Sequence, residues 1–238
     1  MANILTAIAA IYNSSDISVK EVSGGDNKMN DMGEGLEKFI QKAFSDSFNL
    51  DNELKQMQSI NKTFSYLGNK NNPPDLILKN SDAIEVKKIQ SKFSNLQLNS
   101  SHPKEKLIAS NTKLSKACVS CEEWQEKDII YAIGHVPKKS TIKTLWMVYG
   151  DCYAAEANTY EKIEKTISNQ INSIQNIEIN ETTNELSGVK HVDPLNITYL
   201  RVRGMWIIQH PQKVFSYIYT YDDAIEFQLI SLMKKTKI

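Results

Sequence analysis

Two short apolar runs near residue 80 predict a β-hairpin. Residues 76–78 and 83–89 form these runs, and the polar residues 79–82 lie between them. Short apolar runs on either side of an Asn/Ser/Asp turn are typical of hairpins. Pro73 and Pro74 precede the first run and suit the extended start of a strand. We therefore expect two paired strands here, entered from an extended loop.

The N-terminal part of the chain has the periodicity of helices. Residues 4–11 are apolar over too short a length for a membrane span and predict the first turns of a core helix. Residues 49–62 are polar and predict a second helix that leads into residues 64–68, whereas residues 23–30 predict a loop. Residues 33–44 repeat apolar side chains at helical spacing. The resulting stripe consists of Leu36, Phe39, Ile40, Ala43 and Phe44.

Nearly continuous apolar runs at residues 128–134 and 144–150 predict buried strands at the centre of a sheet. Residues 122–127, just before the first run, predict a short helix. From residue 160 onward, isoleucines recur at helical spacing, which predicts a helix that packs them onto the sheet as core. These isoleucines are Ile163, Ile167, Ile171 and Ile174.

The C-terminal part predicts two more strands and a last helix. Residues 197–208 and 214–221 have the character of strands, and residues 222–233 that of a helix. Helices and strands thus alternate along the chain, which predicts the α/β or α+β class. We expect a mixed central sheet with helices on its faces and the hairpin at one edge. The length of 238 residues suits one domain over residues 1–238.

The charge balance limits how the protein could bind nucleic acid. The chain has 28 basic and 28 acidic residues, which argues against a nonspecific binder held by net charge. A nuclease is still compatible, because it can gather its basic side chains in one cleft. No apolar run reaches the roughly 18 residues of a membrane span. No basic leader precedes the N-terminal apolar run, so we expect a cytoplasmic protein without a membrane partner.

Three cysteines, Cys118, Cys121 and Cys152, do not make a secreted disulfide framework. Cys118 and Cys121 have the spacing of zinc ligands, but zinc would also need Cys152 or a histidine. Reduced thiols packed near Trp124 are the favoured interpretation, and a structural zinc site is the alternative.

Three charged side chains of the hairpin could form a metal site. Glu85 and Lys87 lie on one face of their strand, and the hairpin can bring Asp75 beside them. Mg²⁺ prefers one or two carboxylates together with water and phosphate oxygens, and an adjacent ammonium group can orient an attacking water. We expect Asp75 and Glu85 to hold Mg²⁺ and Lys87 to position the water. The pattern resembles the PD-(D/E)xK nuclease signature, although such a hairpin is also common in proteins that are not enzymes.

Longer stretches around the hairpin carry a more specific resemblance. They are residues 64–69, 72–75, 82–89, 98–104, 145–150 and 192–206. In this order they resemble the NgoPII family of type II restriction endonucleases. The resemblance implies the restriction-endonuclease-like fold and Mg²⁺-dependent cleavage of double-stranded DNA at a palindrome, GGCC. We also expect a homodimer, with each subunit cutting one strand, and a methyltransferase that acts on the same site without a stable complex.

The resemblance adds two residues to the expected active site. Nucleases that resemble this chain often carry a helix glutamate ahead of the hairpin. Glu37, at the edge of the apolar stripe, is the candidate for this role, and a solvated helix flank is its alternative. The backbone carbonyl of Val86 is a further expected metal ligand.

Polar residues after the hairpin and two later arginines are the expected DNA contacts. Residues 90–106 are rich in Ser, Asn and Lys and leave the catalytic strand on its DNA side. Arg201 and Arg203 share one face of a strand, and arginine reads guanine with two hydrogen bonds. A solvated loop and an exposed sheet face paired with acids are the respective alternatives. The candidates in the first group are Asn99, Ser100, Ser101, His102 and Lys104.

Two other functions fit parts of the sequence. One is a repair or recombination nuclease of the same fold without strict sequence specificity. The other is a non-catalytic DNA-binding or assembly protein whose carboxylates are only surface charge. The intact Asp75, Glu85 and Lys87 argue against the second, and the resemblance outside the hairpin argues against the first.

Overall fold

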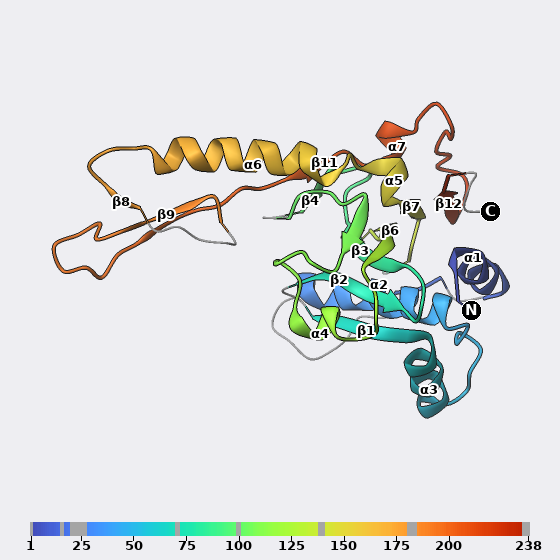
Figure 1. The fold of residues 1–238 in the computed structure, drawn as a ribbon. Coiled ribbons are helices and arrows are strands. Elements are labelled where there is room, and N and C mark those ends of the chain that lie inside the picture. Colours follow the sequence, from blue (N-terminus) through green and yellow to red (C-terminus); the bar gives the residue numbers. More distant parts are fainter. Residues whose placement is uncertain are drawn as a thin grey trace.

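A mixed β-sheet forms the centre of the computed structural model (Figure 1). The structure describes residues 2–14, 17–19, 28–69, 72–98, 101–137, 141–179 and 185–234. The strands of the sheet follow the order β1 (Phe64–Asn69), β2 (Asn72–Leu78), β3 (Ala83–Ile89), β6 (Glu126–His135), β7 (Thr144–Tyr149) and β12 (Gln228–Leu232). Along this order, β3 with β6 and β7 with β12 are parallel, and the other neighbours are antiparallel. The predicted mixed sheet is confirmed.

The first two helices cover one face of the sheet and form one apolar core with it. These helices are α1 (Ile4–Asn13) and α2 (Lys28–Phe44), and the predicted stripe of α2 is buried in this core. The start of α2 includes residues 28–30, which were predicted to be loop, and residues 23–27 lie outside the described residues. The predicted second helix is α3 (Glu53–Thr63), which leads directly into β1.

A second core on the opposite face contains Trp146, whose side chain is fully buried. Short helices contribute to this side of the sheet: α4 (Lys116–Val119), α5 (Gly150–Tyr153) and α7 (Pro211–Val214). The strand predicted at residues 214–221 is wrong, because Val214 ends α7 and the residues after it form turns and irregular structure. Phe215 and Tyr219 are four residues apart, and the centroid of each ring lies 6.3 Å from that of Trp146. Their spacing therefore follows a helical turn.

The C-terminal helix predicted at residues 222–233 is also wrong. Its second half is β12, which pairs in parallel with β7, and the backbone N–H of Gln228 donates to the Lys143 carbonyl at 3.0 Å. Leu229 packs against one core and Ile230 against the other. Apolar side chains on both faces are typical of a strand in a sheet that is covered on both sides, so the apolar run here is that of a buried strand.

The short helix predicted at residues 122–127 is replaced by bends and the start of β6. Glu122 accepts hydrogen bonds from the backbone N–H of Asn80, at 3.1 and 3.2 Å, and forms an ion pair with Lys127. A helix this short gains few internal hydrogen bonds. Its polar residues instead hold the turn of the hairpin.

The hairpin has the predicted strands but not the predicted place in the sheet. β2 and β3 are antiparallel, with Leu76 opposite Ile84. They do not form an edge, because β1 pairs with the outer side of β2 and β6 with that of β3. The residues of the hairpin are therefore enclosed on both sides by neighbouring strands.

The helix predicted around the four isoleucines is present as α6 (Ala157–Asn172), but it does not pack on the sheet. Ile163, Ile167 and Ile174 are 46%, 44% and 53% exposed, so the prediction of a core position is wrong. The helix extends away from the body of the protein (Figure 1). A small antiparallel sheet lies beside it, formed by β8 (Glu178–Ile179), β9 (Ser187–Lys190) and β10 (Leu200–Val202). We call residues 157–205 the arm.

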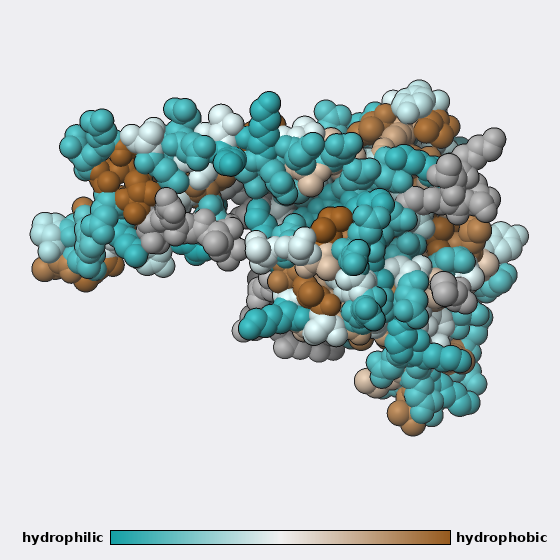
Figure 2. All heavy atoms as spheres, in the orientation of Figure 1, coloured by the Kyte–Doolittle hydropathy of each residue, from teal (hydrophilic) through white to brown (hydrophobic). Residues whose placement is uncertain are grey.

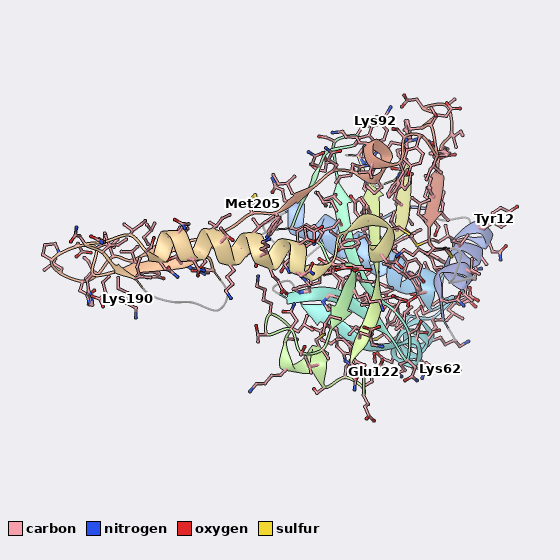
Figure 3. All side chains as sticks on the ribbon, turned by 45° about the horizontal axis from the view of Figure 1, so that its top comes forward. Tyr12, Lys62, Lys92, Glu122, Lys190 and Met205 are labelled. Atoms are coloured by element: carbon pink, nitrogen blue, oxygen red, sulfur yellow. The ribbon has the colours of Figure 1, made fainter. Side chains whose placement is uncertain are left out.

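The strand predicted at residues 197–208 is divided between the arm and the body. Its first part is β10, and its second part, β11 (Ile207–Ile208), pairs with β4 (Leu96–Gln97). Met205 lies where the arm joins the body, and Lys190 lies farther out along it (Figure 3). A further short strand, β5 (Lys106–Ile108), pairs with β6. None of the described helices combines the length and the apolar character of a membrane span.

The cysteines pack as the favoured interpretation predicts. Cys118 is fully buried in the second core, and Cys121 and Trp124 pack against that core. Burial raises the pKa of the Cys118 thiol to about 11. Zinc binds the thiolate, so this environment disfavours the metal-bound form.

Gly68 allows β1 to approach β2 closely. A Cβ atom at this position would lie 2.6 Å from the Pro74 carbonyl oxygen and 2.7 Å from that of Asp75. Such overpacking typically costs about 1–3 kcal/mol. We expect Gly68→Ala to lower the midpoint of thermal unfolding by several degrees. Gly204→Ala is the control, since its new Cβ would meet only Leu186 side-chain atoms at 3.6 and 3.8 Å. Equal midpoints for the two variants would contradict this account.

Candidate active site

The hairpin brings together the three side chains predicted to be catalytic. Asp75 lies on β2 and opposes Glu85 of β3, one residue beyond the Leu76–Ile84 pair. The Lys87 Nζ lies 2.7 Å from Glu85 Oε1. The Asp75 Oδ2 accepts a hydrogen bond of 2.6 Å from the backbone N–H of Val86. This bond fixes the Asp75 carboxylate beside β3.

Burial makes the electrostatics of this site unfavourable in the absence of a cation. Glu85 is 9% exposed, and its Oε2 has no hydrogen-bond partner among the described residues. Burial and the nearby Glu85 charge raise the pKa of Asp75 to about 8, although Lys87 opposes the shift. Burial alone would lower the pKa of Lys87. The attraction of the Glu85 and Asp75 carboxylates outweighs this effect and raises the pKa above its usual value. Two carboxylates thus share one ammonium group.

The same features fit a hard divalent cation. Such a cation would supply the missing partner of Glu85 Oε2 and relieve the repulsion between the two carboxylates. The described residues hold no group of three or more His, Cys, Asp and Glu side chains arranged for a metal. Mg²⁺ does not need one, because it commonly uses one or two carboxylates and completes its shell with water and phosphate oxygens.

The Val86 carbonyl is also suitably oriented. The N–H and C=O groups of one strand residue point to the same side of the strand. The Val86 N–H points to Asp75, so its carbonyl oxygen faces the same side of β3.

Glu37 lies near this pair of carboxylates. Its side chain is half-buried on α2, and Oε1 accepts a hydrogen bond of 3.2 Å from the Gln41 amide. Burial raises the pKa of Glu37, and the charges of Glu34 and then Glu85 add to the shift. The residue is therefore not simply a solvated helix flank, and it is placed to act on the charge of the site.

Tyr131 belongs to the surroundings of the site but has no distinct signal in the sequence. It lies on β6 opposite Glu85. Its hydroxyl accepts a hydrogen bond of 2.7 Å from the backbone N–H of Lys104 and donates one of 3.3 Å to the carbonyl of the same residue. Tyr131 thereby ties the segment after the hairpin to the sheet. In the sequence Tyr131 is only a single tyrosine within an apolar strand, and this pattern does not indicate the role.

His102 and Lys104 are buried, unlike residues of a solvated loop. The His102 ring stacks on that of Tyr160 with centroids 5.0 Å apart, and Lys104 is 7% exposed. Burial lowers the pKa of Lys104, and the charge of Glu85 is the largest effect that opposes this shift. Both side chains line a pocket of about 490 Å³ together with Lys106, Lys113 and Glu164.

The remaining DNA-contact candidates are not gathered at the active site. Ser101 is half-buried beside His102. Asn99 and Ser100 lie outside the described residues. Arg201 and Arg203 lie on the arm, where both pair with Glu185; the Arg203 Nε lies 3.3 Å from Glu185 Oε1. These two arginines share one face, as predicted, and their side chains are 51% and 57% exposed.

The raised pKa of Asp75 gives a pH dependence that can be tested. Its carboxyl holds a proton more tightly in the folded protein, where its pKa is about 8, than in the unfolded chain, at about 3.8. Stability without a divalent cation should therefore fall as pH rises through this interval. Asp75→Asn should flatten that fall and raise the unfolding midpoint at pH 8, measured in chelator at pH 5 and pH 8. Asp51→Asn, at an exposed position, serves as the control. A slope for Asp75→Asn equal to that of the unaltered protein would refute the assignment.

Comparison with known proteins identifies the family of the chain. The family model described as NgoPII restriction endonuclease matches residues 2–238. The type II restriction enzyme NgoPII of Neisseria gonorrhoeae is 48% identical over 235 residues, which cover 99% of this chain and 84% of that enzyme. No solved structure is detectably similar to the chain. The chain therefore belongs to the NgoPII restriction endonuclease family and is a site-specific deoxyribonuclease.

Proposed function

We propose that this restriction endonuclease makes Mg²⁺-dependent cuts in both strands of DNA at the palindrome GGCC. One observation carries the proposal for the metal. Glu85 is buried beside the half-buried Asp75, the two carboxylates share a single ammonium group, and Glu85 Oε2 has no partner among the described residues. Membership of this family of restriction endonucleases supports a short palindrome as the target. The resemblance of the sequence segments around the hairpin to the NgoPII family supports GGCC as that palindrome.

Asp75, Glu85 and the Val86 carbonyl are the proposed ligands. When bound there, Mg²⁺ lowers the pKa of water and offsets the charge that develops on the phosphodiester. The Val86 N–H keeps the Asp75 carboxylate oriented toward the site at 2.6 Å. Glu37 contributes negative charge from α2, which strengthens the attraction for a cation.

Lys87 is proposed to orient the attacking water. Its raised pKa keeps the ammonium group protonated, so it acts as a hydrogen-bond donor and does not accept a proton from water. Water attacks phosphorus and the bond to the 3′ oxygen breaks. The products carry a 5′-phosphate and a 3′-hydroxyl.

The proposed DNA contacts come from two segments. Asn99, Ser100 and Ser101 follow the hairpin, and the next residues His102 and Lys104 pack in the pocket that they line with Lys113 and Glu164. Lys104 also adds positive charge near the bound phosphate. Arg201 and Arg203 are proposed to exchange Glu185 for guanine or phosphate, which their exposure permits.

The proposed assembly is a homodimer, because a two-fold symmetric protein reads a palindrome with identical surfaces. We place its action in the cytoplasm. A methyltransferase acts on the same DNA site without forming a stable complex with it.

Digestion of plasmid DNA of known sequence tests the function. With Mg²⁺, the protein should give discrete fragments whose ends map within GGCC, and without Mg²⁺ the plasmid should stay intact.

Lys87→Ala should slow cleavage by about 10²–10³-fold, the usual effect of losing one well-placed donor, while DNA binding persists. Lys88→Ala is the matched control on the other face of the same strand. Cuts within another palindrome would reject GGCC alone, and a smear would reject sequence specificity. Full activity of Lys87→Ala would reject its role.

Recognition by the arm has its own test. Arg203→Ala should relax or abolish recognition, because a bidentate contact contributes about 1–3 kcal/mol of discrimination between bases. Lys190→Ala removes a cation from the neighbouring strand β9 and is the control (Figure 3). Cleavage rates on GGCC duplexes and on duplexes with one altered base pair measure the effect. An unchanged rate ratio for Arg203→Ala would exclude a base-reading role.

A further inference from the structure

Lys104 is a buried cation that forms an ion pair with no carboxylate among the described residues. Its ammonium group donates to the His102 carbonyl at 3.4 Å, which is long for a hydrogen bond. A buried ammonium group is costly unless a nearby anion neutralises its charge. The position of Lys104 therefore suits a negatively charged ligand.

The pocket that Lys104 lines has a polar lining. Lys106 and Lys113 line it as well, but Lys106 pairs with Glu126 at 2.5 Å and Lys113 pairs with Glu164 at 3.4 Å. Lys104 is thus the lysine of this pocket whose charge an ion pair does not balance. Where the arm meets the body, the surface visible in Figure 2 is mainly hydrophilic. These features favour a charged ligand over an apolar one.

Lys104 lies within electrostatic range of the proposed metal site. Burial lowers the pKa of Lys104, the charge of Glu85 opposes this shift, and the charge of Lys87 adds to it. Alternation along β3 places Glu85 and Lys87 on one face of the strand. Tyr131 is the partner of Glu85 in the parallel strand β6, so its side chain lies on the same face. The backbone of Lys104 is bonded to Tyr131 and therefore approaches the site from this face.

One hydroxyl group holds both backbone polar groups of Lys104. Tyr131 Oη accepts a hydrogen bond of 2.7 Å from the Lys104 N–H and donates one of 3.3 Å to the Lys104 carbonyl. Tyr131 is itself buried, so a phenylalanine at this position would leave both groups without that partner. Because both groups of one residue are fixed, the direction in which the Lys104 side chain leaves the backbone is fixed as well.

Other parts of the sheet hold the same segment. Gly150 directly follows β7, and a Cβ atom there would collide with the carbonyl oxygens of Lys104 and Glu105. Two residues after Lys104, β5 begins and pairs with β6, with Lys106 opposite Asp128. The backbone at Lys104 is thus confined by three strands. A side chain that contacts a reacting group needs support of this kind.

We propose that Tyr131 is a positioning residue for DNA cleavage, which fixes the backbone of Lys104 and so directs the Lys104 ammonium group to a phosphate of the strand that is cut. The inference rests on the proposed function, in which the hairpin binds Mg²⁺ and cuts the phosphodiester. The phosphate supplies the anion that the buried ammonium group lacks. The ammonium group in turn offsets negative charge that develops during cleavage. Tyr131 touches neither the DNA nor the metal and acts only through Lys104.

A double-mutant cycle separates positioning from a merely structural role. Tyr131→Phe keeps the ring and removes the hydroxyl, and it should slow single-turnover cleavage of a GGCC duplex about tenfold, the size expected from one or two buried hydrogen bonds. Lys104→Met removes the charge and should slow cleavage at least as much. In the Lys104→Met background, Tyr131→Phe should have no further effect, because the group that it positions is gone.

Tyr149→Phe is the matched control. Tyr149 is a buried tyrosine of the neighbouring strand β7, and its hydroxyl donates to Asp82 Oδ2, just before β3, at 2.8 Å. This variant should cleave at the rate of the unaltered protein. Assays well below the unfolding midpoints of all variants, with unchanged circular dichroism spectra, keep a loss of stability from affecting the rates.

DNA affinity gives a second readout that does not need cleavage. On a GGCC duplex with an uncleavable phosphodiester, Lys104→Met should reduce the slope of log affinity against log salt concentration by about one, the loss of one phosphate contact. Tyr131→Phe should weaken binding in the unaltered protein and leave binding by Lys104→Met unchanged.

Three results would overturn the proposed positioning. They are cleavage by Tyr131→Phe at the rate of the unaltered protein, cleavage by Lys104→Met at that rate, and an equal effect of Tyr131→Phe with and without the Lys104 side chain. The last result would give Tyr131 a structural role only. An intact plasmid with the unaltered protein would reject the proposed function, and the binding cycle would then decide the positioning by itself.

Discussion

Asp75 and Glu85 are adjacent carboxylates on two paired strands. Asp75 is half-buried and Glu85 is buried. Both carboxylates interact with the same ammonium group, that of Lys87. Close like charges in a buried site repel each other strongly. The fold holds them together through neighbouring strands on both sides of the hairpin and through the hydrogen bond from Val86 to Asp75. The rest of the site follows from this constraint. It favours a divalent cation, and it keeps Lys87 protonated as a donor.

The enclosed position of the hairpin explains why the site needs support from the whole sheet. β1 closes its outer side, and Gly68 lets β1 approach the backbone at Asp75. On the other side, β6 brings Tyr131 opposite Glu85 and ties down the segment that contains Lys104. The groups proposed as catalytic and the proposed DNA-contacting segment are thus parts of one hydrogen-bonded layer.

Local patterns in the sequence predicted elements whose apolar side chains meet a core nearby. The hairpin, the stripe of α2 and the central strands β6 and β7 are of this kind. The errors occurred where distant contacts decide the structure. Leu229 and Ile230 are shared between two cores by pairing of β12 with β7, and Phe215 and Tyr219 pack on Trp146 from turns. The isoleucines of α6 have a helical period but pack into neither core of the described residues, and periodicity alone does not show what a stripe packs against. The proximity of Asp75, Glu85 and Lys87 could be predicted from their spacing, and their catalytic role stays a prediction. The burial of His102 and Lys104 depends on contacts with Tyr160 and Tyr131.

The central claim is that the buried pair of carboxylates binds a divalent cation, and its most direct test is a titration with Mn²⁺, followed by electron paramagnetic resonance of the free ion. Mn²⁺ takes the same oxygen ligands as Mg²⁺. In the presence of a GGCC duplex with an uncleavable phosphodiester, the unaltered protein should bind a cation at each hairpin. Glu85→Gln should lose that binding while retaining its fold and its affinity for DNA. Binding of Mn²⁺ by Glu85→Gln with the affinity of the unaltered protein would contradict the account.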